Sequence, residues 1–418
     1  MRRFYGNSRR MLLIILSILV GTGTTHASEV DALTISQNIQ WFHVPYGTVL
    51  DPVFASSDPA SQGYSQIVGY ARAGDSAIWT GHYLAAEAFR YQVTRSPDAL
   101  ANARLALRGI HSLLEITGTD VLARCLVPTN SPYAPAIQQA EAGNGIYYSK
   151  LGDQPYFWIG KTSRDQYSGV VFGLSVAYDM IDEPDVRGLI QQDLTRILNY
   201  LLAHNWNVTM PDGTVSTTFA FRPDQQLSFL QTGRRINPQR FALTYAIYRS
   251  VYAAFVGVPV FLDDQDDHNH YFKFNLNYIN LYDLIRLEED GSPYKAIYMN
   301  AYDMLRRTTQ QHGNPHFNMV DRALKGQDIV RDNETVTLLN LWLWRTRRDY
   351  WVDLRGKYPA CGTDRACSPI PVNERVNTDF LWQRSPFLLF GGGAGLIETA
   401  AIDYILPYWM ARYYGLTP

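Results

Sequence analysis

The sequence lacks several features that would assign a function directly. Only three of its 418 residues are cysteines, only 18% are charged, and the formal net charge is -2. A charge balance this close to neutral argues against a nucleic-acid surface, so we expect no nucleic-acid partner. The chain has no Gly-x-Ser-x-Gly elbow, no phosphate-binding loop with lysine and no dinucleotide fingerprint. The glycines at 391–395 lack the strand and helix context of such a fingerprint, and we predict no cofactor.

The cysteines are few enough to consider one by one. Cys361 and Cys367 bracket a short loop that contains glycine, and this spacing favours a local disulfide in an exported protein, although spacing alone leaves the pairing open. Cys125 is then unpaired. We interpret it as a buried free thiol rather than a catalytic nucleophile.

The N-terminus has the layout of a secretory signal peptide. Four arginines lie within the first ten residues, the apolar run Met11–Val20 follows, and small residues end at Ala27. The run has about half of the ~20 residues that a membrane-spanning helix needs. We predict cleavage near Ala27 and a secreted or periplasmic protein without a stable membrane span, with an uncleaved anchor as the alternative.

The remaining chain is dominated by helical patterns. After an extended N-terminal segment at 28–74, apolar residues recur at three- and four-residue intervals, and proline and glycine separate successive pairs of segments. The predicted helical hairpins are 77–91 with 97–114, 166–181 with 186–202, 225–231 with 240–255, and 272–287 with 294–307. A fifth pair combines 334–344 with a final helix at about 397–414. Few stretches alternate with period two. We therefore predict an all-α fold, an α/α toroid of helical hairpins over residues 75–418 with long aromatic-rich loops.

Charged and amide residues gather at the predicted helix starts. Any one carboxylate there is explained by capping, but the repeated combination of arginine, aspartate and amide predicts that several helix ends line one opening. Two carboxylates at such an opening suit hydrolysis of a glycosidic bond. Asp165 is the first candidate for a catalytic carboxylate and Asp224 the second. The predicted substrate-binding residues at these helix starts are Asp75, Arg164, Gln166, Tyr167, Arg222, Gln225, Arg331 and Glu334.

Histidine and tryptophan residues support further hypotheses. His82 and His316, with Tyr167 and the nearby Asn314 and Asn318, fit a polysaccharide lyase that removes a proton beside a uronate carboxylate. Trp79 and Trp382 are candidate platforms for stacking on sugar rings, although core packing is the better explanation of any single tryptophan. A third hypothesis is a non-catalytic glycan-binding or envelope scaffold protein.

One acidic run could hold a metal ion. The segment 263–270 contains four aspartates and two histidines, which are ligand types for Ca²⁺ or Zn²⁺. It lacks the spacing of an EF-hand and has no cysteine partner. We interpret it as a solvated loop and assign no metal.

Three segments carry a resemblance to known proteins. The segments 74–91, 164–169 and 405–414 resemble a group of secreted bacterial proteins of unassigned activity. The series of hairpins resembles the α/α-toroid glycoside hydrolases and polysaccharide lyases. This resemblance concerns architecture and implies no particular catalytic residue. Together with the residues above it leads us to expect an exported carbohydrate-active enzyme, most simply a glycoside hydrolase acting on an oligo- or polysaccharide.

Overall fold

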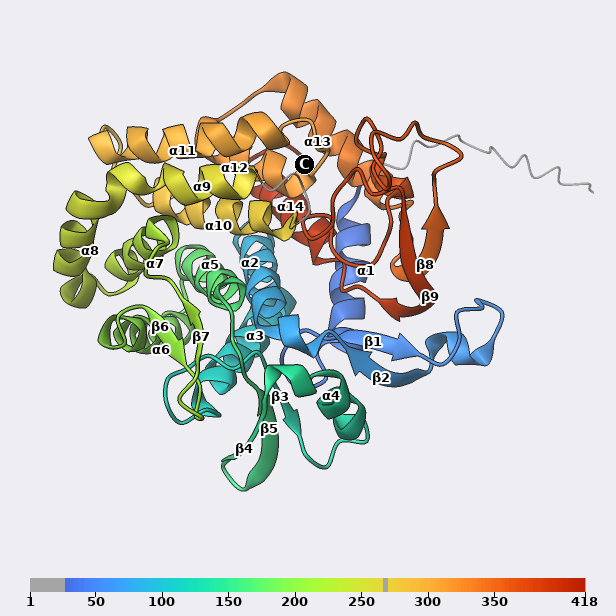
Figure 1. Cartoon of the computed structure of the whole chain (residues 1–418), viewed down its shortest axis with the longest axis horizontal. Coiled ribbons are helices and arrows are strands. Elements are labelled where there is room, and N and C mark those ends of the chain that lie inside the picture. Colours follow the sequence, from blue (N-terminus) through green and yellow to red (C-terminus); the bar gives the residue numbers. More distant parts are fainter. Residues whose placement is uncertain (1–26, 266–269, 418) are drawn as a thin grey trace, which may run out of the picture.

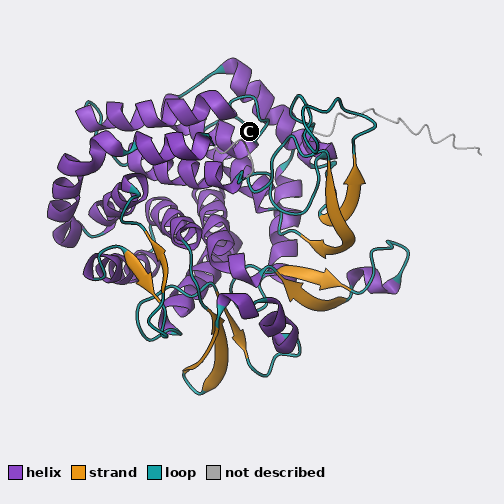
Figure 2. Ribbon diagram, in the orientation of Figure 1, coloured by secondary structure: helices purple, strands orange, loops and turns teal. Residues whose placement is uncertain are grey.

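The computed structural model describes residues 27–265 and 270–417 and contains both helices and strands (Figures 1 and 2). The predicted signal peptide lies outside the described residues except for Ala27. Residues 266–269 of the acidic run also lie outside them.

Six buried helices form the centre of the molecule, and each contacts the next in chain order. Proline is the first residue of several helices, where its fixed φ and missing N–H cost nothing. The central helices are α2 (Ser76–Thr94), α5 (Arg164–Met180), α7 (Pro223–Ile236), α10 (Phe272–Arg286), α12 (Pro315–Lys325) and α14 (Ile402–Tyr413). Around them lie α1 (Glu29–Asn38), α3 (Pro97–Glu115), α4 (Ala134–Ala140), α6 (Pro184–Ala203), α8 (Pro238–Tyr252), α9 (Gly257–Asp264), α11 (Pro293–Thr309) and α13 (Ile329–Trp342). The first four predicted hairpins are confirmed as α2/α3, α5/α6, α7/α8 and α10/α11. The helices of the fifth pair are present as α13 and α14, but β8 and β9 lie between them in the chain.

Antiparallel sheets at the border of the helical part make the prediction of an all-α toroid wrong (Figure 2). The first sheet has the order β2-β1-β9-β8, the second β3-β5-β4, and the third pairs β6 with β7. The strands are β1 (Asp51–Phe54), β2 (Ile67–Ala71), β3 (Cys125–Pro128), β4 (Ile146–Leu151), β5 (Gln154–Ile159), β6 (Asn207–Thr209), β7 (Val215–Thr218), β8 (Arg348–Asp353) and β9 (Phe390–Glu398).

The helices also depart from a regular ring. Helix α10 packs against α5 as well as against its neighbours α7 and α12. In Figure 1, α9, α10 and α11 run across the picture, whereas α5 is seen closer to end-on. The fold is therefore a mixed α and β structure whose central helices differ in direction.

The N-terminal segment is more structured than its composition suggested. Residues 28–74 were expected to be extended, but α1 occupies Glu29–Asn38, and β1 and β2 follow it. Ser28 caps α1, because its side chain accepts a hydrogen bond from the Asp31 backbone N–H and Asp31 reciprocates. Ala32, Ile35 and Ile39 then join the main hydrophobic core, which extends to Ala411. Helix α1 is thus part of the fold.

Two further sequence predictions concern the cysteines. Cys361 and Cys367 form a disulfide, as predicted. Cys125 is a buried free cysteine in β3, also as predicted, and burial raises the pKa of its thiol to about 12. A thiol in this environment is protonated at neutral pH and is a poor nucleophile.

Among the described residues no single helix is long and apolar enough to cross a membrane. One bent pair, Pro238–Phe255 with Gly257–Asp264, meets the criteria of length and composition only when both parts are taken together across a bend of 43°.

Candidate functional site

Helices α2 and α5 cross in contact through their backbones. A Cβ atom added at Gly81 would lie 2.0 Å from the carbonyl oxygen of Gly169, and one added at Gly173 would lie 2.3 Å from that of Gly81. Gly169 faces α2 in the same way, because its added Cβ would lie 2.7 Å from the Ile78 carbonyl oxygen. The three glycines let the N-terminal ends of α2 and α5 meet.

Gln166 connects these two helix ends. Its Oε1 accepts a hydrogen bond of 3.0 Å from the backbone N–H of Ile78, which lies in the first turn of α2. Its Nε2 donates at 3.1 Å to Oδ1 of Asp75, the residue before α2. Gln166 is fully buried, whereas one third of the Asp75 side chain is exposed. The amide therefore caps one helix and holds a carboxylate that solvent can reach.

Asp165 lies in the first turn of α5 and directly precedes Gln166, the residue that donates to Asp75. Its Oδ1 accepts hydrogen bonds from the Ser163 hydroxyl and, at 3.0 Å, from the Gln166 backbone N–H. Arg124 donates to Ser163 Oγ and to the Gly74 carbonyl, both at 2.7 Å, and its Nη1 lies 3.7 Å from Asp75 Oδ1. One arginine thus holds both segments that carry the carboxylates.

The environment of Asp75 favours its protonated form. Burial, together with the negative charges of Asp165 and Asp379, raises the pKa of Asp75 to about 7, although Arg124 opposes this rise. A carboxyl group with a pKa near 7 can donate a proton at neutral pH. Asp165 is partly exposed and lies within electrostatic reach. The two side chains therefore form a carboxyl pair at the joined ends of α2 and α5.

Asp224, the second predicted catalytic carboxylate, is held in a different arrangement. It is 1% exposed and accepts two hydrogen bonds from Arg222, at 3.1 and 2.8 Å. Arg222 also donates at 2.9 Å to Asp263, whose segment was considered for metal binding. Burial raises the pKa of Asp224 and Arg222 opposes this rise. The geometry is that of a buried structural ion pair at the start of α7.

Arg164 links this ion pair to the carboxyl pair. Burial lowers the pKa of Arg164, the nearby Arg222 lowers it further, and Asp224, Asp263 and Asp165 raise it. Its Nη1 donates at 3.3 Å to the Thr218 carbonyl. Arg164 therefore lies within electrostatic reach of both Asp165 and Asp224, which belong to the first turns of α5 and α7.

Replacing Asp224 with alanine is expected to lower the free energy of unfolding by about 3 kcal/mol, because it leaves the buried charge of Arg222 with fewer partners. Urea unfolding followed by circular dichroism measures this loss. The matched control is Asp185→Ala, which removes an exposed partner of Arg104 and should cost about 1 kcal/mol or less. Equal losses for both variants would contradict the structural role of Asp224.

The predicted aromatic and histidine residues meet in the interior. The ring centroid of Trp382 lies 5.2 Å from that of His82 and 5.0 Å from that of His316. The ring centroids of Trp79 and His82 are 5.3 Å apart. All four side chains are buried. Burial lowers the pKa of His82 to about 4 and that of His316 well below its ordinary value, so both rings are neutral.

Tyr167 and Gln225 are buried as well. The Tyr167 hydroxyl accepts a hydrogen bond of 3.1 Å from the Leu122 backbone N–H, and its ring packs against Phe219. The structure places neither residue beside the carboxyl pair at the surface.

Arg331 and Glu334 line a separate cavity of 630 Å³ with Arg306 and Asp321. Arg331 donates at 2.7 Å to Asp321, and Glu334 accepts at 2.9 Å from Asn318. Arg331 and Glu334 thus lie on the same helix, α13, and line the same cavity. The predicted site residues fall into the carboxyl pair, the Arg222 ion pair, the buried aromatic cluster and this cavity.

Sequence reasoning missed Arg124 and Asp379, which set the environment of Asp75. Arg124 precedes the buried strand β3, and Asp379 lies in a loop before Phe380, whose ring packs 4.7 Å from that of Trp79. Neither residue lies at a helix start. The only available signal was the position of both within long loops, since long loops in a compact domain are often functional.

Comparisons of the chain with protein-family models, with curated proteins and with solved structures found no match. The functional argument therefore depends on the geometry alone. Among the described residues no group of three or more histidine, cysteine, aspartate or glutamate side chains is arranged to hold a metal ion.

Proposed function

We propose that this protein is an exported glycoside hydrolase that uses Asp75 as the general acid and Asp165 as the second carboxylate. The observation that carries the proposal is the pairing of two partly exposed carboxyl groups, one of which has its pKa raised to about 7. Asp75 takes the place of Asp224, because Asp224 is buried in an ion pair with Arg222. The signal-peptide pattern supports export to the periplasm or beyond.

The chemistry follows from the two different environments. Protonated Asp75 donates its proton to the oxygen of the leaving sugar as the glycosidic bond breaks. Asp165, which accepts hydrogen bonds from Ser163 and from the backbone of Gln166, acts on the opposite side of the bond by activating water or by attacking the sugar carbon. Arg124 holds the segments of both residues in place.

Burial of the proposed lyase residues favours hydrolysis over elimination. A lyase would need Tyr167 or His316 at the uronate ring, but both side chains are 0% exposed. The Tyr167 hydroxyl already accepts a backbone hydrogen bond. The proposed acid of the hydrolase is instead within reach of solvent.

The decisive experiment is incubation of the mature protein with neutral and uronate-containing polysaccharides. Reducing ends and the absorbance of unsaturated sugars are followed together. Reducing ends without new absorbance support hydrolysis, whereas both signals together identify a lyase. Binding without either product on every polymer that is bound would favour the scaffold hypothesis and contradict the proposal.

The hydrolytic rate is expected to fall as the pH rises through about 7, because Asp75 then loses the proton that it must donate. Below this pH Asp75 keeps the proton that it donates. A pH profile of kcat/KM measures the alkaline limb. A rate that stays constant from pH 6 to pH 9 would exclude Asp75 as the acid.

Asp379→Asn provides a sharper form of this test. The Asp379 charge raises the pKa of Asp75, so its removal is expected to move the alkaline limb to lower pH while the rate at the optimum changes less. Asparagine keeps an oxygen that can accept the hydrogen bond from the Phe380 backbone. The matched control is Asp353→Asn. Asp353 is the last residue of β8 and pairs with Arg355, and its replacement should leave the pH of the alkaline limb unchanged.

A further inference from the structure

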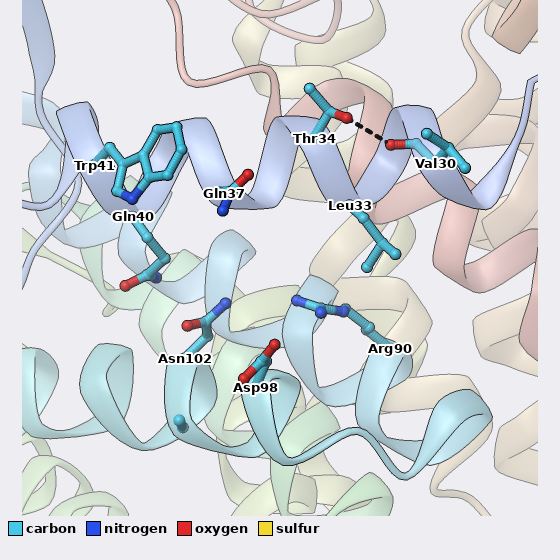
Figure 3. Close-up of a pocket in the computed structure, with 10 residues that line it drawn as sticks. Val30, Leu33, Thr34, Gln37, Gln40, Trp41, Arg90, Asp98 and Asn102 are labelled. Carbon is cyan, nitrogen blue, oxygen red and sulfur yellow. Dashed lines mark hydrogen bonds between the residues drawn. The ribbon is translucent and has the colours of Figure 1, made fainter.

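A groove of about 450 Å³ lies between α1 and the helices α2 and α3 (Figure 3). Its floor is formed by Arg90 of α2, and its walls carry side chains of α1 and α3. The lining residues used below are Gln37, Gln40, Trp41, Arg90, Asp98 and Asn102. None of them belongs to the carboxyl pair. Asp75 and Arg90 are 15 positions apart in sequence, which corresponds to about 22 Å along a helix.

Arg90 lies at the floor of this groove and is paired with a buried glutamate. The residue is only 5% exposed, and its Nη1 donates at 2.9 Å to the fully buried Glu87. Glu87 also accepts at 2.7 Å from the Ser36 hydroxyl of α1. Since Glu87 neutralises the charge of Arg90, the floor of the groove is polar without a net positive charge.

The walls of the groove carry planar polar groups. Gln37, Gln40 and Asn102 each have amide donors and an acceptor, and Asp98 adds a carboxylate that faces Arg90 across the groove (Figure 3). Gln40 Nε2 donates at 2.5 Å to the Tyr83 hydroxyl, which fixes the orientation of its amide. Such groups can donate to and accept from neighbouring hydroxyls at the same time.

Trp41 lies at one end of the groove, and 66% of the residue is exposed. Trp344 and Trp351 are exposed to a similar degree, but of these three tryptophans only Trp41 lines the groove. Its flat apolar face can pack against the apolar face of a sugar ring, and large apolar side chains that are left in water often mark binding sites.

We propose that this groove binds a segment of a neutral polysaccharide, at a site separate from the carboxyl pair. Hydroxyl-rich, uncharged rings match the amides, the neutralised Arg90 and the Trp41 face. Uronates fit less well, because Asp98 repels their carboxylates and Glu87 already neutralises the only arginine of the lining. The proposal rests on the proposed function in one respect, since the bound chain is taken to be the polymer that is hydrolysed elsewhere.

The test is affinity electrophoresis of the full mature protein in gels that contain soluble β-glucan, xylan, mannan or, as the anionic probe, alginate. The measurement is made on Asp165→Asn, so that hydrolysis cannot remove the polymer during the run. At least one neutral polymer is expected to slow migration, and adding Trp41→Ala should weaken this binding at least roughly tenfold. Asn102→Ala should weaken it to a smaller extent.

The control is Trp344→Ala, which removes another exposed tryptophan, one that does not line the groove, and it should not change migration. The proposal is overturned if no neutral polymer slows the protein, if only alginate does, or if Trp41→Ala migrates like its parent. These results are independent of the proposed function. If the unmodified protein hydrolyses a polymer but no polymer slows its migration, only the groove proposal is contradicted. If a neutral polymer slows migration but the unmodified protein hydrolyses none, only the catalytic proposal is contradicted.

Discussion

Asp165→Asn is expected to lower the turnover of the preferred polysaccharide by about 10² to 10⁴-fold, the range that a positioned acid or base contributes. The asparagine side chain has the same shape and still accepts hydrogen bonds from Ser163 and from the Gln166 backbone. It lacks the negative charge that activates water or attacks the sugar carbon. Steady-state release of reducing ends measures the loss, and circular dichroism confirms that the variant is folded.

Asp75→Asn should cause a loss of the same order by a different route, because it removes the proton that the leaving oxygen needs. Its effect on stability has a definite sign. Native Asp75 holds its proton up to about pH 7, whereas the unfolded side chain ionises near 3.8. Wild-type stability therefore falls as the pH rises from about 4 to 7, and this contribution is absent in the variant. Melting temperatures across this range should decline less for Asp75→Asn than for the wild type.

The matched control for both variants is Asp153→Asn, an exposed aspartate in the turn between β4 and β5. It should change neither turnover nor the melting temperature appreciably. If Asp165→Asn keeps wild-type activity, then Asp165 is not the second carboxylate. If instead Asp75→Asn alone is active, another group supplies the proton.

The helical hairpins could be predicted because their signals are local. Pro97, Pro184, Pro238 and Pro293 begin helices, and apolar residues recur behind each of them with the helical period. Helix α12 was not among the predicted segments, although its start carries the same signal. In the structure Pro315 is the first residue of that helix and Asn314 caps it by accepting from the backbone N–H groups of residues 316 and 317.

The sheets were missed because their strands are short and only partly alternating. The strands β4 and β5 form a hairpin around Gly152 and Asp153, with Leu151 paired to Gln154. The glycine and aspartate between two aromatic segments were a usable turn signal. By contrast, β1 and β9 lie more than 300 residues apart in the chain, and no local pattern predicts that they pair.

The candidate site was predictable only in part for the same reason. Asp75, Asp165 and Gln166 occupy helix starts, so their meeting could be inferred from the expected convergence of helix ends. The separate roles of Asp165 and Asp224 could not be inferred from the sequence. They depend on Arg222, which binds Asp224, and on Arg124, which holds the segments that carry Asp75 and Asp165. The raised pKa of Asp75 depends on burial and on Asp379, which comes from a distant loop.

Gly81→Ala is expected to prevent stable folding, with a loss beyond the roughly 5 kcal/mol that marks an exceptional single substitution. The added methyl group would lie 2.0 Å from the carbonyl oxygen of Gly169, which is backbone and cannot rotate away. The helices cannot separate locally either, because Gly169 meets Ile78 and Gly173 meets the Gly81 carbonyl at similarly short distances. Ordinary overpacking costs only about 1–3 kcal/mol, since side chains can usually adjust.

The matched control is Gly188→Ala in the interior of α6, where an added Cβ meets nothing within 4 Å. Alanine there should stabilise the protein by about 0.5–1 kcal/mol, because glycine is the poorer helix former. Thermal and urea unfolding of the two variants separate the effect of close helix contact from that of helix propensity. A Gly81→Ala protein that unfolds like the wild type would mean that α2 and α5 do not cross at these glycines. The position of Gln166 between Ile78 and Asp75, and with it the carboxyl pair, would then lose its structural basis.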